Sequence, residues 1–401
     1  MSKSILFISH EASRTGAPIL LRNLLKWIST NTSIPFHILL MREGVLVEDF
    51  ANIAPVSLWK REESARFTLT KGAAILFNSL GIMKGWQQRA LRTRLAKNNI
   101  GLIYANTIAT GTLVEELSNF NCPVICHVHE LEYLIRHHGG CGLHNSFQKI
   151  KRHTHHYLAA SEAVKRNLIR SHGISQDQVD VTYEFVGPDC QGFEQSETMN
   201  SKIRKELDIP EDSFVIGAAG TIEWRKGPDL FIQLAHKVLS KKLNVPIHFV
   251  WVGGEAEGYH FGALEHDIER LGLKAHMHFT GTKQVPFGYF SLFDIFTLVS
   301  REDPFPLVML EAAYLGKPII CFDEAGGASE FVGDDCGFVV SYLDLESMAL
   351  KTVELLQSHS LSRSLGEHAA QKVREHHTVE VVGPKILTVI QRFLGEAVTT
   401  S

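Results

Sequence analysis

Residues 300–318 read SREDPFPLVMLEAAYLGKP and join an acidic loop to an apolar helix. The loop holds Asp303, and the helix carries Glu311 eight positions later, so both carboxylates are expected to face one cleft. A carboxylate in the loop can accept hydrogen bonds from sugar hydroxyls, and one a helical turn deeper can accept a pair from a ribose diol. Between them, the backbone N–H groups from Phe305 to Val308 are expected at the open amino end of the helix, which favours a bound diphosphate.

Short apolar runs alternate with segments of helical periodicity on both sides of this stretch. Such alternation is typical of parallel strands joined by crossover helices. The second half of the chain predicts strands at residues 214–219, 247–253, 277–280, 295–298, 318–321 and 338–340, followed by a helical tail at 344–394. The first half predicts strands at residues 4–9, 36–41, 102–106, 124–129 and 157–159.

A polar, glycine-bearing stretch at residues 184–212 separates the two sets of strands, as an interdomain linker would. The chain has 401 residues, more than one hydrophobic core comfortably organises. The sequence therefore predicts an α/β protein of two Rossmann-like, doubly wound domains that face each other across a cleft. We expect the domains at residues 1–190 and 191–380, with a C-terminal helix at 381–401 that crosses back to the first domain.

The composition excludes several classes of protein. The net charge is −4 and the pI is about 6.6, so the chain lacks the excess of basic residues that is typical of nucleic-acid-binding proteins. No nucleic-acid partner is therefore expected. The six cysteines are sparse and lack paired CxxC spacing, which favours reduced thiols in a cytoplasmic protein. The first residues, MSKSILFISH, read as a strand rather than a signal peptide, and no apolar run has the length of a membrane span.

Two further segments of the second half have the composition of a nucleotide site. GTIEWRKGPD, from Gly220 to Asp229, places cations and glycines at the first strand-to-helix turn. Gly326 and Gly327 open the turn GGASE, which ends at Glu330, and glycines allow a backbone to approach a ligand closely.

These segments resemble three motifs of glycosyltransferase family 4, which has the GT-B fold. Residues 300–318 are similar to its donor-binding E-x7-E motif, with Asp303 in place of the first Glu. Gly220 to Asp229 resembles its G-R-x-x-x-K-G element, so Lys226 corresponds to the diphosphate clamp. The usual Arg is Thr221 here, and Arg225 is the nearest substitute. Residues 326–330 resemble the glycine-rich turn beside the donor.

The first domain carries looser likenesses. HEASRTGAP, from His10 to Pro18, resembles the glycine-containing loop of the family that closes over the donor phosphates and the acceptor. His129 ends an expected strand and matches the family's His-Asp or His-Glu element near the transferred sugar. A histidine at a strand end can equally bond only to backbone groups.

The resemblance implies a retaining, metal-independent glycosyltransferase that moves a hexose-type sugar from a UDP- or GDP-sugar to a hydroxyl acceptor, in polysaccharide or glycolipid synthesis. Its implied partners are the donor and a carbohydrate or lipid-linked acceptor, and no cofactor is expected. The catalytic candidates are Asp303, Glu311, Lys226, Arg225 and His129. The candidates for donor binding are Gly16, Gly220, Thr221, Phe305, Pro306, Leu307, Val308, Gly326, Gly327 and Glu330.

Four alternatives stay open. A nucleotide-sugar epimerase or hydrolase on the same fold would consume donor without an acceptor, and a non-catalytic scaffold would only bind it. The basic segment from Lys71 to Lys97 could dock on anionic lipid at the inner membrane face or form a solvated amphipathic helix. A metal reading rests on the polar cluster of His137, His138, Cys141, His144, His153, His155 and His156, whose spacing matches no standard zinc pattern.

Overall fold

The computed structural model describes residues 3–59, 90–137 and 142–395. The chain divides into two compact units. Unit 1 comprises residues 1–159, 167–182 and 383–401, and unit 2 comprises residues 160–166 and 183–382. Neither unit is one continuous stretch of sequence, and helices α8 (Glu162–His172) and α18 (Val379–Leu394) each have residues in both units.

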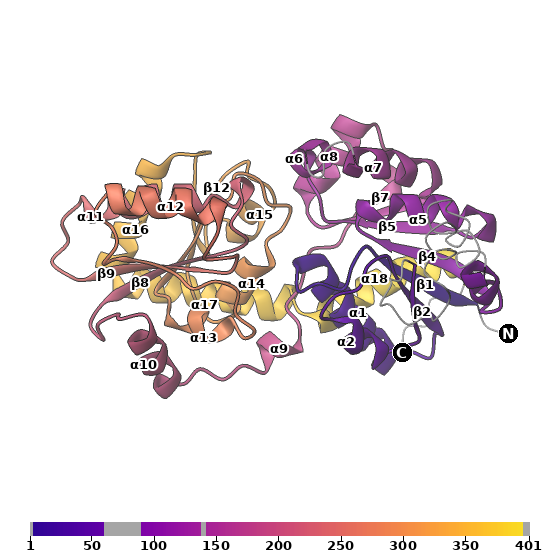
Figure 1. Cartoon of the computed structure of the whole chain (residues 1–401), viewed down its shortest axis with the longest axis horizontal. Coiled ribbons are helices and arrows are strands. Elements are labelled where there is room, and N and C mark those ends of the chain that lie inside the picture. Colours follow the sequence, from indigo (N-terminus) through magenta and orange to yellow (C-terminus); the bar gives the residue numbers. More distant parts are fainter. Residues whose placement is uncertain (1–2, 60–89, 138–141, 396–401) are drawn as a thin grey trace, which may run out of the picture. The chain divides into compact units, whose positions relative to one another are not determined.

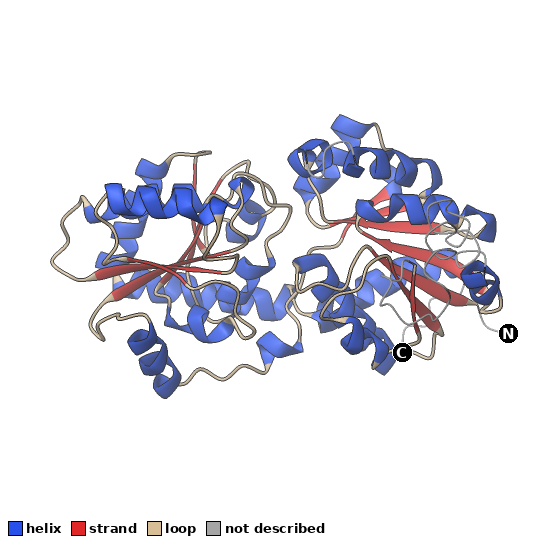
Figure 2. Ribbon diagram, in the orientation of Figure 1, coloured by secondary structure: helices blue, strands red, loops and turns tan. Residues whose placement is uncertain are grey.

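Unit 1 is built on a parallel sheet with the strand order β3-β2-β1-β4-β5-β6-β7. Figures 1 and 2 show helices on both faces of this sheet, with α5 and α7 on one side and α1 and α18 on the other. The strands are β1 (Ser4–Ser9), β2 (Phe36–Leu40), β3 (Val56–Leu58), β4 (Ile100–Asn106), β5 (Val124–Val128), β6 (His156–Ala159) and β7 (Val179–Val181). The remaining helices are α1 (Gly16–Asn31), α2 (Val47–Ala51), α5 (Gly111–Glu116), α6 (Glu132–His137) and α7 (Gly142–His153).

Unit 2 repeats this plan with a parallel sheet of order β10-β9-β8-β11-β12-β13. Its strands are β8 (Phe214–Ala219), β9 (Ile247–Val252), β10 (Met277–Phe279), β11 (Ile295–Leu298), β12 (Ile319–Phe322) and β13 (Gly337–Val340). Its helices are α9 (Pro188–Gln191), α10 (Glu197–Glu206), α11 (Pro228–Leu239), α12 (Tyr259–Arg270), α13 (Phe287–Leu292), α14 (Leu307–Tyr314), α15 (Ala328–Val332), α16 (Leu345–Gln357) and α17 (His359–His376). The predicted fold class, two doubly wound Rossmann-like domains, is confirmed.

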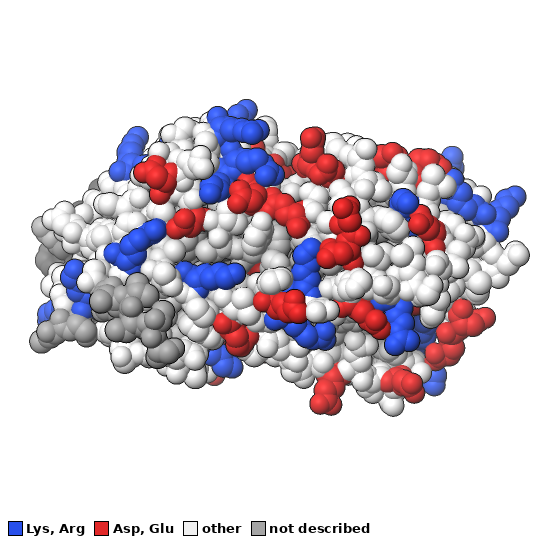
Figure 3. Space-filling model, turned by 180° about the vertical axis from the view of Figure 1, so that it is seen from behind, with Lys and Arg blue, Asp and Glu red and all other residues white. Residues whose placement is uncertain are grey.

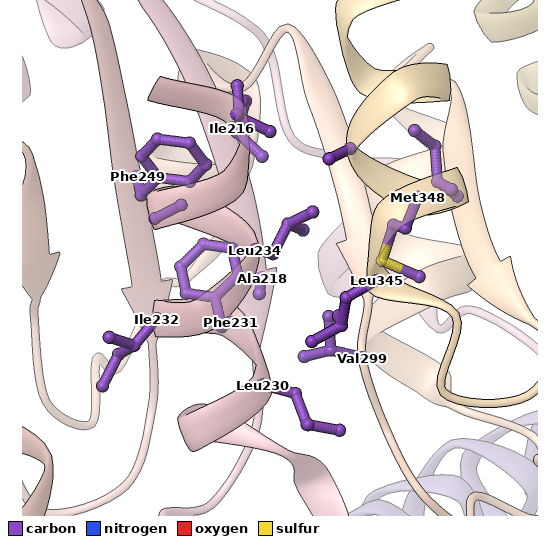
Figure 4. Packing of buried hydrophobic residues seen from close by; sticks show 14 of the residues in the cluster. Ile216, Ala218, Leu230, Phe231, Ile232, Leu234, Phe249, Val299, Leu345 and Met348 are labelled. Atoms are coloured by element: carbon purple, nitrogen blue, oxygen red, sulfur yellow. The ribbon is translucent and has the colours of Figure 1, made fainter. Parts of the chain in front are cut away.

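The core of unit 2 fixes helix α11 against the sheet. Phe231 of α11 packs its ring near Phe249 and Trp251 of strand β9, at centroid distances of 5.8 and 5.7 Å. Figure 4 shows Phe231 and Leu234 between strand residues on one side and Met348 of α16 on the other. The loop that joins β8 to α11 is therefore held at both ends by buried apolar residues.

Gly227 ends this loop in a left-handed conformation, with φ of 74°. A Cβ at this position would lie 2.2 Å from the carbonyl oxygen of Val299. We expect Gly227→Ala to lower the free energy of unfolding by about 1–3 kcal/mol, because both the backbone conformation and the contact are unfavourable. Chemical denaturation measures this change. Gly262→Ala in α12, where no atom lies within 4 Å of the new methyl group, is the matched control and should be neutral or slightly stabilising. Equal stability of the two variants would contradict the expectation.

The surface is mixed in charge. On the face shown in Figure 3, basic and acidic side chains are interspersed over the described part of the chain. None of the described helices combines the length and apolar character needed to cross a membrane. Most of the segment from Lys71 to Lys97 and the pair His138 and Cys141 lie outside the described residues.

Candidate active site

Three predicted motifs of unit 2 meet at one edge of its sheet. Gly220 follows β8, the acidic loop with Asp303 follows β11, and the turn at Gly326 follows β12. These strands are neighbours in the order β8-β11-β12, and carboxyl ends of parallel strands lie at the same edge. Asp303 and Gly326 also form an isolated parallel bridge, so the acidic loop and the glycine-rich turn are in direct contact.

Lys226 and Asp303 form an ion pair in this edge. The Nζ atom of Lys226 lies 2.5 Å from the Oδ2 atom of Asp303, and both side chains are largely buried. Ser300 also donates to the same carboxylate at 3.3 Å. The predicted diphosphate clamp and the predicted sugar-binding carboxylate are therefore one connected group, which holds both in fixed orientations.

Arg225 turns into the same group. Its guanidinium lies 3.7 Å from Asp303 and donates to the carbonyl of Glu302 at 2.9 Å. Glu223 accepts from both Arg225 and Thr221 at 2.9 Å, so Thr221 helps to place the carboxylate that orients Arg225. The Nε atom of Arg225 is buried with no hydrogen-bond partner among the described residues.

The start of α14 offers unpaired backbone donors. Among the described residues, the N–H groups of Phe305, Leu307 and Val308 have no hydrogen-bond acceptor, and no side chain caps the helix. Pro306 must be removed from the predicted set of donors, because proline has no N–H. It still serves as the N-cap residue, and its carbonyl accepts from Met309 at 3.1 Å.

The glycine-rich turn supports the acidic loop from behind. Gly327 donates to the carbonyls of Asp303 and Pro304 at 3.2 and 3.0 Å. A Cβ on Gly327 would lie 2.4 Å from the Pro304 oxygen, so only glycine fits. The Glu330 carboxylate accepts from the amides of Glu162 and Ala163 at 2.9 and 2.7 Å, so it caps the start of α8.

Glu311 differs from the other acidic residues of the edge. It keeps some exposed surface, and its carboxylate has no hydrogen-bond donor among the described residues. Burial of the carboxyl raises the pKa of Glu311 to about 8, and the negative charge of Asp189 in α9 adds to the rise. Helix α14 therefore carries, eight residues after Asp303, an acid that is mostly protonated at neutral pH and whose oxygens accept no hydrogen bond from the described residues.

The candidates of unit 1 meet at the carboxyl edge of its own sheet. Gly16 is exposed at the first position of α1, and His129 follows strand β5. The ring of His129 lies 4.1 Å from that of His127, and its Nε2 atom lies 3.1 Å from Oδ1 of Asn106. Asn106 is a site residue that the sequence reasoning did not single out. The available signal in the sequence was a polar residue at the last position of an expected apolar strand.

Metal ligands do not gather in the part of the chain that the structure describes: no three His, Cys, Asp or Glu side chains lie close enough to hold an ion. His153 ends α7, His155 lies in the connection that follows, and His156 begins β6, where it pairs with Asp180 at 2.9 Å.

Two family models match the chain in tandem. The model described as Glycosyltransferase Family 4 matches residues 48–189, and the model described as Glycosyl transferases group 1 matches residues 199–372. The chain belongs to glycosyltransferase family 4. The second match contains all the unit 2 motifs described above, from Gly220 to Glu330.

Curated relatives of this family member are distant. It is 24% identical over 248 residues to the capsular polysaccharide biosynthesis glycosyltransferase CapM of Staphylococcus aureus. This match covers 60% of this chain and 62% of CapM. It is 26% identical over 178 residues to a D-inositol 3-phosphate glycosyltransferase of Corynebacterium jeikeium. This second match covers 43% of this chain and 42% of the relative. The chain thus matches less than two thirds of the length of these relatives.

Among solved structures, this chain resembles the Anabaena HepE protein, which was crystallised with UDP and glucose. The TM-score is 0.79 at 20% identity, and the match covers 97% of this chain and 99% of HepE. At this identity the likeness concerns the fold, which is GT-B.

Proposed function

We propose that the chain is a retaining glycosyltransferase that moves a hexose-type sugar from a UDP- or GDP-sugar to a hydroxyl acceptor in polysaccharide or glycolipid synthesis. One observation carries the proposal: Lys226 and Arg225 meet the Asp303 carboxylate at the sheet edge where α14 begins, and the amides of Phe305, Leu307 and Val308 have no acceptor there among the described residues. Family membership supports it, as do CapM, named for capsular polysaccharide biosynthesis, and HepE, crystallised with UDP and glucose.

In this proposal the donor diphosphate binds Lys226, Arg225 and the N–H groups of Phe305, Leu307 and Val308. The charges of Lys226 and Arg225 are balanced by Asp303 and Glu223, so directed donors rather than net charge attract the phosphates. When the bond to the sugar breaks, negative charge develops on the leaving diphosphate. A fixed donor aimed at such charge contributes about 3 kcal/mol to transition-state stabilisation, which makes a divalent cation unnecessary.

The sugar end of the site uses the remaining groups. Asp303 accepts hydrogen bonds from sugar hydroxyls, Glu311 holds the ribose, and His129 lies near the sugar or the acceptor. The acceptor hydroxyl attacks from the face that the diphosphate leaves, and a phosphate oxygen helps to remove its proton, so the anomeric configuration is retained. No protein nucleophile is assigned. A lipid-linked acceptor would suit membrane contact by the basic segment from Lys71 to Lys97.

Ligand-induced stabilisation tests the donor site. We expect one of UDP, GDP or ADP, and its sugars, to raise the melting temperature selectively, with the same shift in a chelator, because a ligand that binds only the folded state stabilises it by RT ln(1 + [L]/Kd). At 100 times Kd this equals about 2.7 kcal/mol. A shift that disappears with chelator would contradict metal independence, and no shift with any nucleotide would contradict the proposed donor site itself.

An acceptor-dependence assay then separates transfer from the rival reactions. Product formation from the stabilising donor is expected only when a carbohydrate or lipid-linked acceptor is present. Donor consumption without acceptor would identify an epimerase or hydrolase instead.

A further inference from the structure

Asn106 connects the two candidate elements of unit 1. It is 1% exposed and is the last residue of β4, the strand that lies between β1 and β5 in the sheet (Figure 1). Its Nδ2 atom donates to the carbonyl oxygen of Ala17 at 3.0 Å, in the first turn of α1 beside Gly16. Its Oδ1 atom lies 3.1 Å from Nε2 of His129. One side chain therefore holds both the helix start and the histidine.

These two contacts determine which ring nitrogen of His129 is protonated. A carbonyl oxygen only accepts hydrogen bonds, so the atom of Asn106 that faces Ala17 must be the NH2 group. The atom that faces His129 is then the amide oxygen, which accepts only. The Nε2 atom of His129 must supply the proton, and a neutral ring then keeps its lone pair on Nδ1.

The surroundings keep the His129 ring in place. Glu130 accepts from the backbone N–H of His129 at 2.9 Å, and the ring of His127 packs against that of His129 with the centroids 4.1 Å apart and the planes tilted by 38°. His127 is itself fixed by the hydroxyl of Tyr104 at 2.8 Å. These neighbours thus restrict the backbone of His129 and the plane of its ring, and Asn106 determines which ring nitrogen carries the proton.

The backbone just after Asn106 is strained. Thr107 has φ of 82° and ψ of 153°, a conformation that a β-branched residue rarely adopts. Its amide donates to the carbonyl of His127 at 2.9 Å, and its hydroxyl accepts from Ala109 at 3.2 Å. These bonds maintain a sharp turn directly at the end of β4, and strain of this kind is concentrated at functional sites.

We propose that Asn106 is a positioning residue that fixes the Nε2–H tautomer of His129 and ties this ring to the start of α1. The inference rests on the proposed function, in which His129 lies near the transferred sugar. The fixed tautomer makes Nε2 the donor to Asn106 and Nδ1 the acceptor atom of the ring.

The test compares Asn106→Ala with Asn106→Asp and a matched control, Asn98→Ala. Asn98 lies just before β4, and its amide contacts another histidine, His37, at 3.4 Å. Imidazole 15N chemical shifts of His129, assigned with His129→Gln, report the tautomer. Steady-state kinetics report kcat and the donor KM.

We expect Asn106→Ala to give a mixture of His129 tautomers and to lower kcat at least about tenfold, with the donor KM within about twofold. Asn106→Asp loses the donor to Ala17 but keeps an acceptor for Nε2–H, so it should keep Nε2 protonated and recover part of kcat even if the alanine variant folds poorly. Asn98→Ala should change neither measurement. Unchanged 15N shifts in Asn106→Ala, or a changed tautomer with unchanged kcat, would overturn the inference. If the wild type transfers no sugar, the proposed function fails, and the 15N comparison still decides the tautomer.

Discussion

Glu311→Gln is expected to weaken binding of the UDP- or GDP-sugar by about tenfold to a hundredfold, because a carboxylate that accepts from a ribose diol contributes about 1.5–3 kcal/mol. Glutamine has the same shape but offers only one acceptor oxygen and no charge. Isothermal titration calorimetry at pH 8 measures the loss. Glu354→Gln, in the exposed ion pair with Lys351, is the control and should bind donor normally. Equal affinity of the two variants would remove Glu311 from the donor site.

The raised pKa of Glu311 gives this variant a second signature. The acid is protonated in both states below pH 4.5, and only the unfolded chain ionises between pH 4.5 and about 8. The wild type therefore loses free energy of unfolding as pH rises through this range, by about 1.4 kcal/mol for each unit of pKa shift. Glu311→Gln should lack this loss. Donor affinity should change in the opposite direction: it rises towards pH 8 in the wild type, where the carboxylate forms, and stays level in the variant.

Lys226→Ala is expected to reduce sugar transfer about a hundredfold to a thousandfold, because the diphosphate loses one fixed cation in the transition state. The variant also leaves the buried carboxylate of Asp303 with the Ser300 hydroxyl and, as its cation, the more distant guanidinium of Arg225 at 3.7 Å. Some loss of stability is therefore expected as well, and single-turnover kinetics at a temperature well below unfolding isolates the chemical step.

Lys237→Ala provides the matched comparison for this variant. Lys237 forms an ion pair with Glu346 at 3.0 Å in the same unit, but at an exposed site. Its removal should cost at most about 1 kcal/mol of stability and leave transfer unchanged. If Lys226→Ala behaves like this control, the clamp assignment is wrong.

Most of the fold follows from the sequence, because the buried parallel strands are continuous apolar runs. The predicted strands at residues 4–9, 214–219 and 295–298 match β1, β8 and β11, and the other predicted strands differ from the structure by one or two residues. The short edge strands β3 and β7 were missed, since VSL and VDV combine three residues with a polar centre. The tail predicted as helical is divided into α16, α17 and α18.

The candidate site was predicted less completely. The motif positions indicated which loops meet, but not the pairing of Lys226 with Asp303, which depends on side-chain direction across two strands. The sequence also does not predict whether the Arg225 side chain turns inward. Its direction is set by hydrogen bonds to the Glu302 carbonyl and the Glu223 carboxylate, which depend on the folded structure. Asn106 was overlooked because its two partners lie 89 and 23 residues away in the chain.

Helix α18 has a consequence for the synthesis of this protein. Gly383 lies so close to Trp27 that a Cβ would be 2.8 Å from its ring, and Arg392 bonds to Asp180 at 3.1 Å. These contacts belong to unit 1, whose sheet begins at Ser4. A ribosome therefore releases the residues of unit 2 before the last helix that unit 1 needs. The first part of the chain to emerge is the last to be completed.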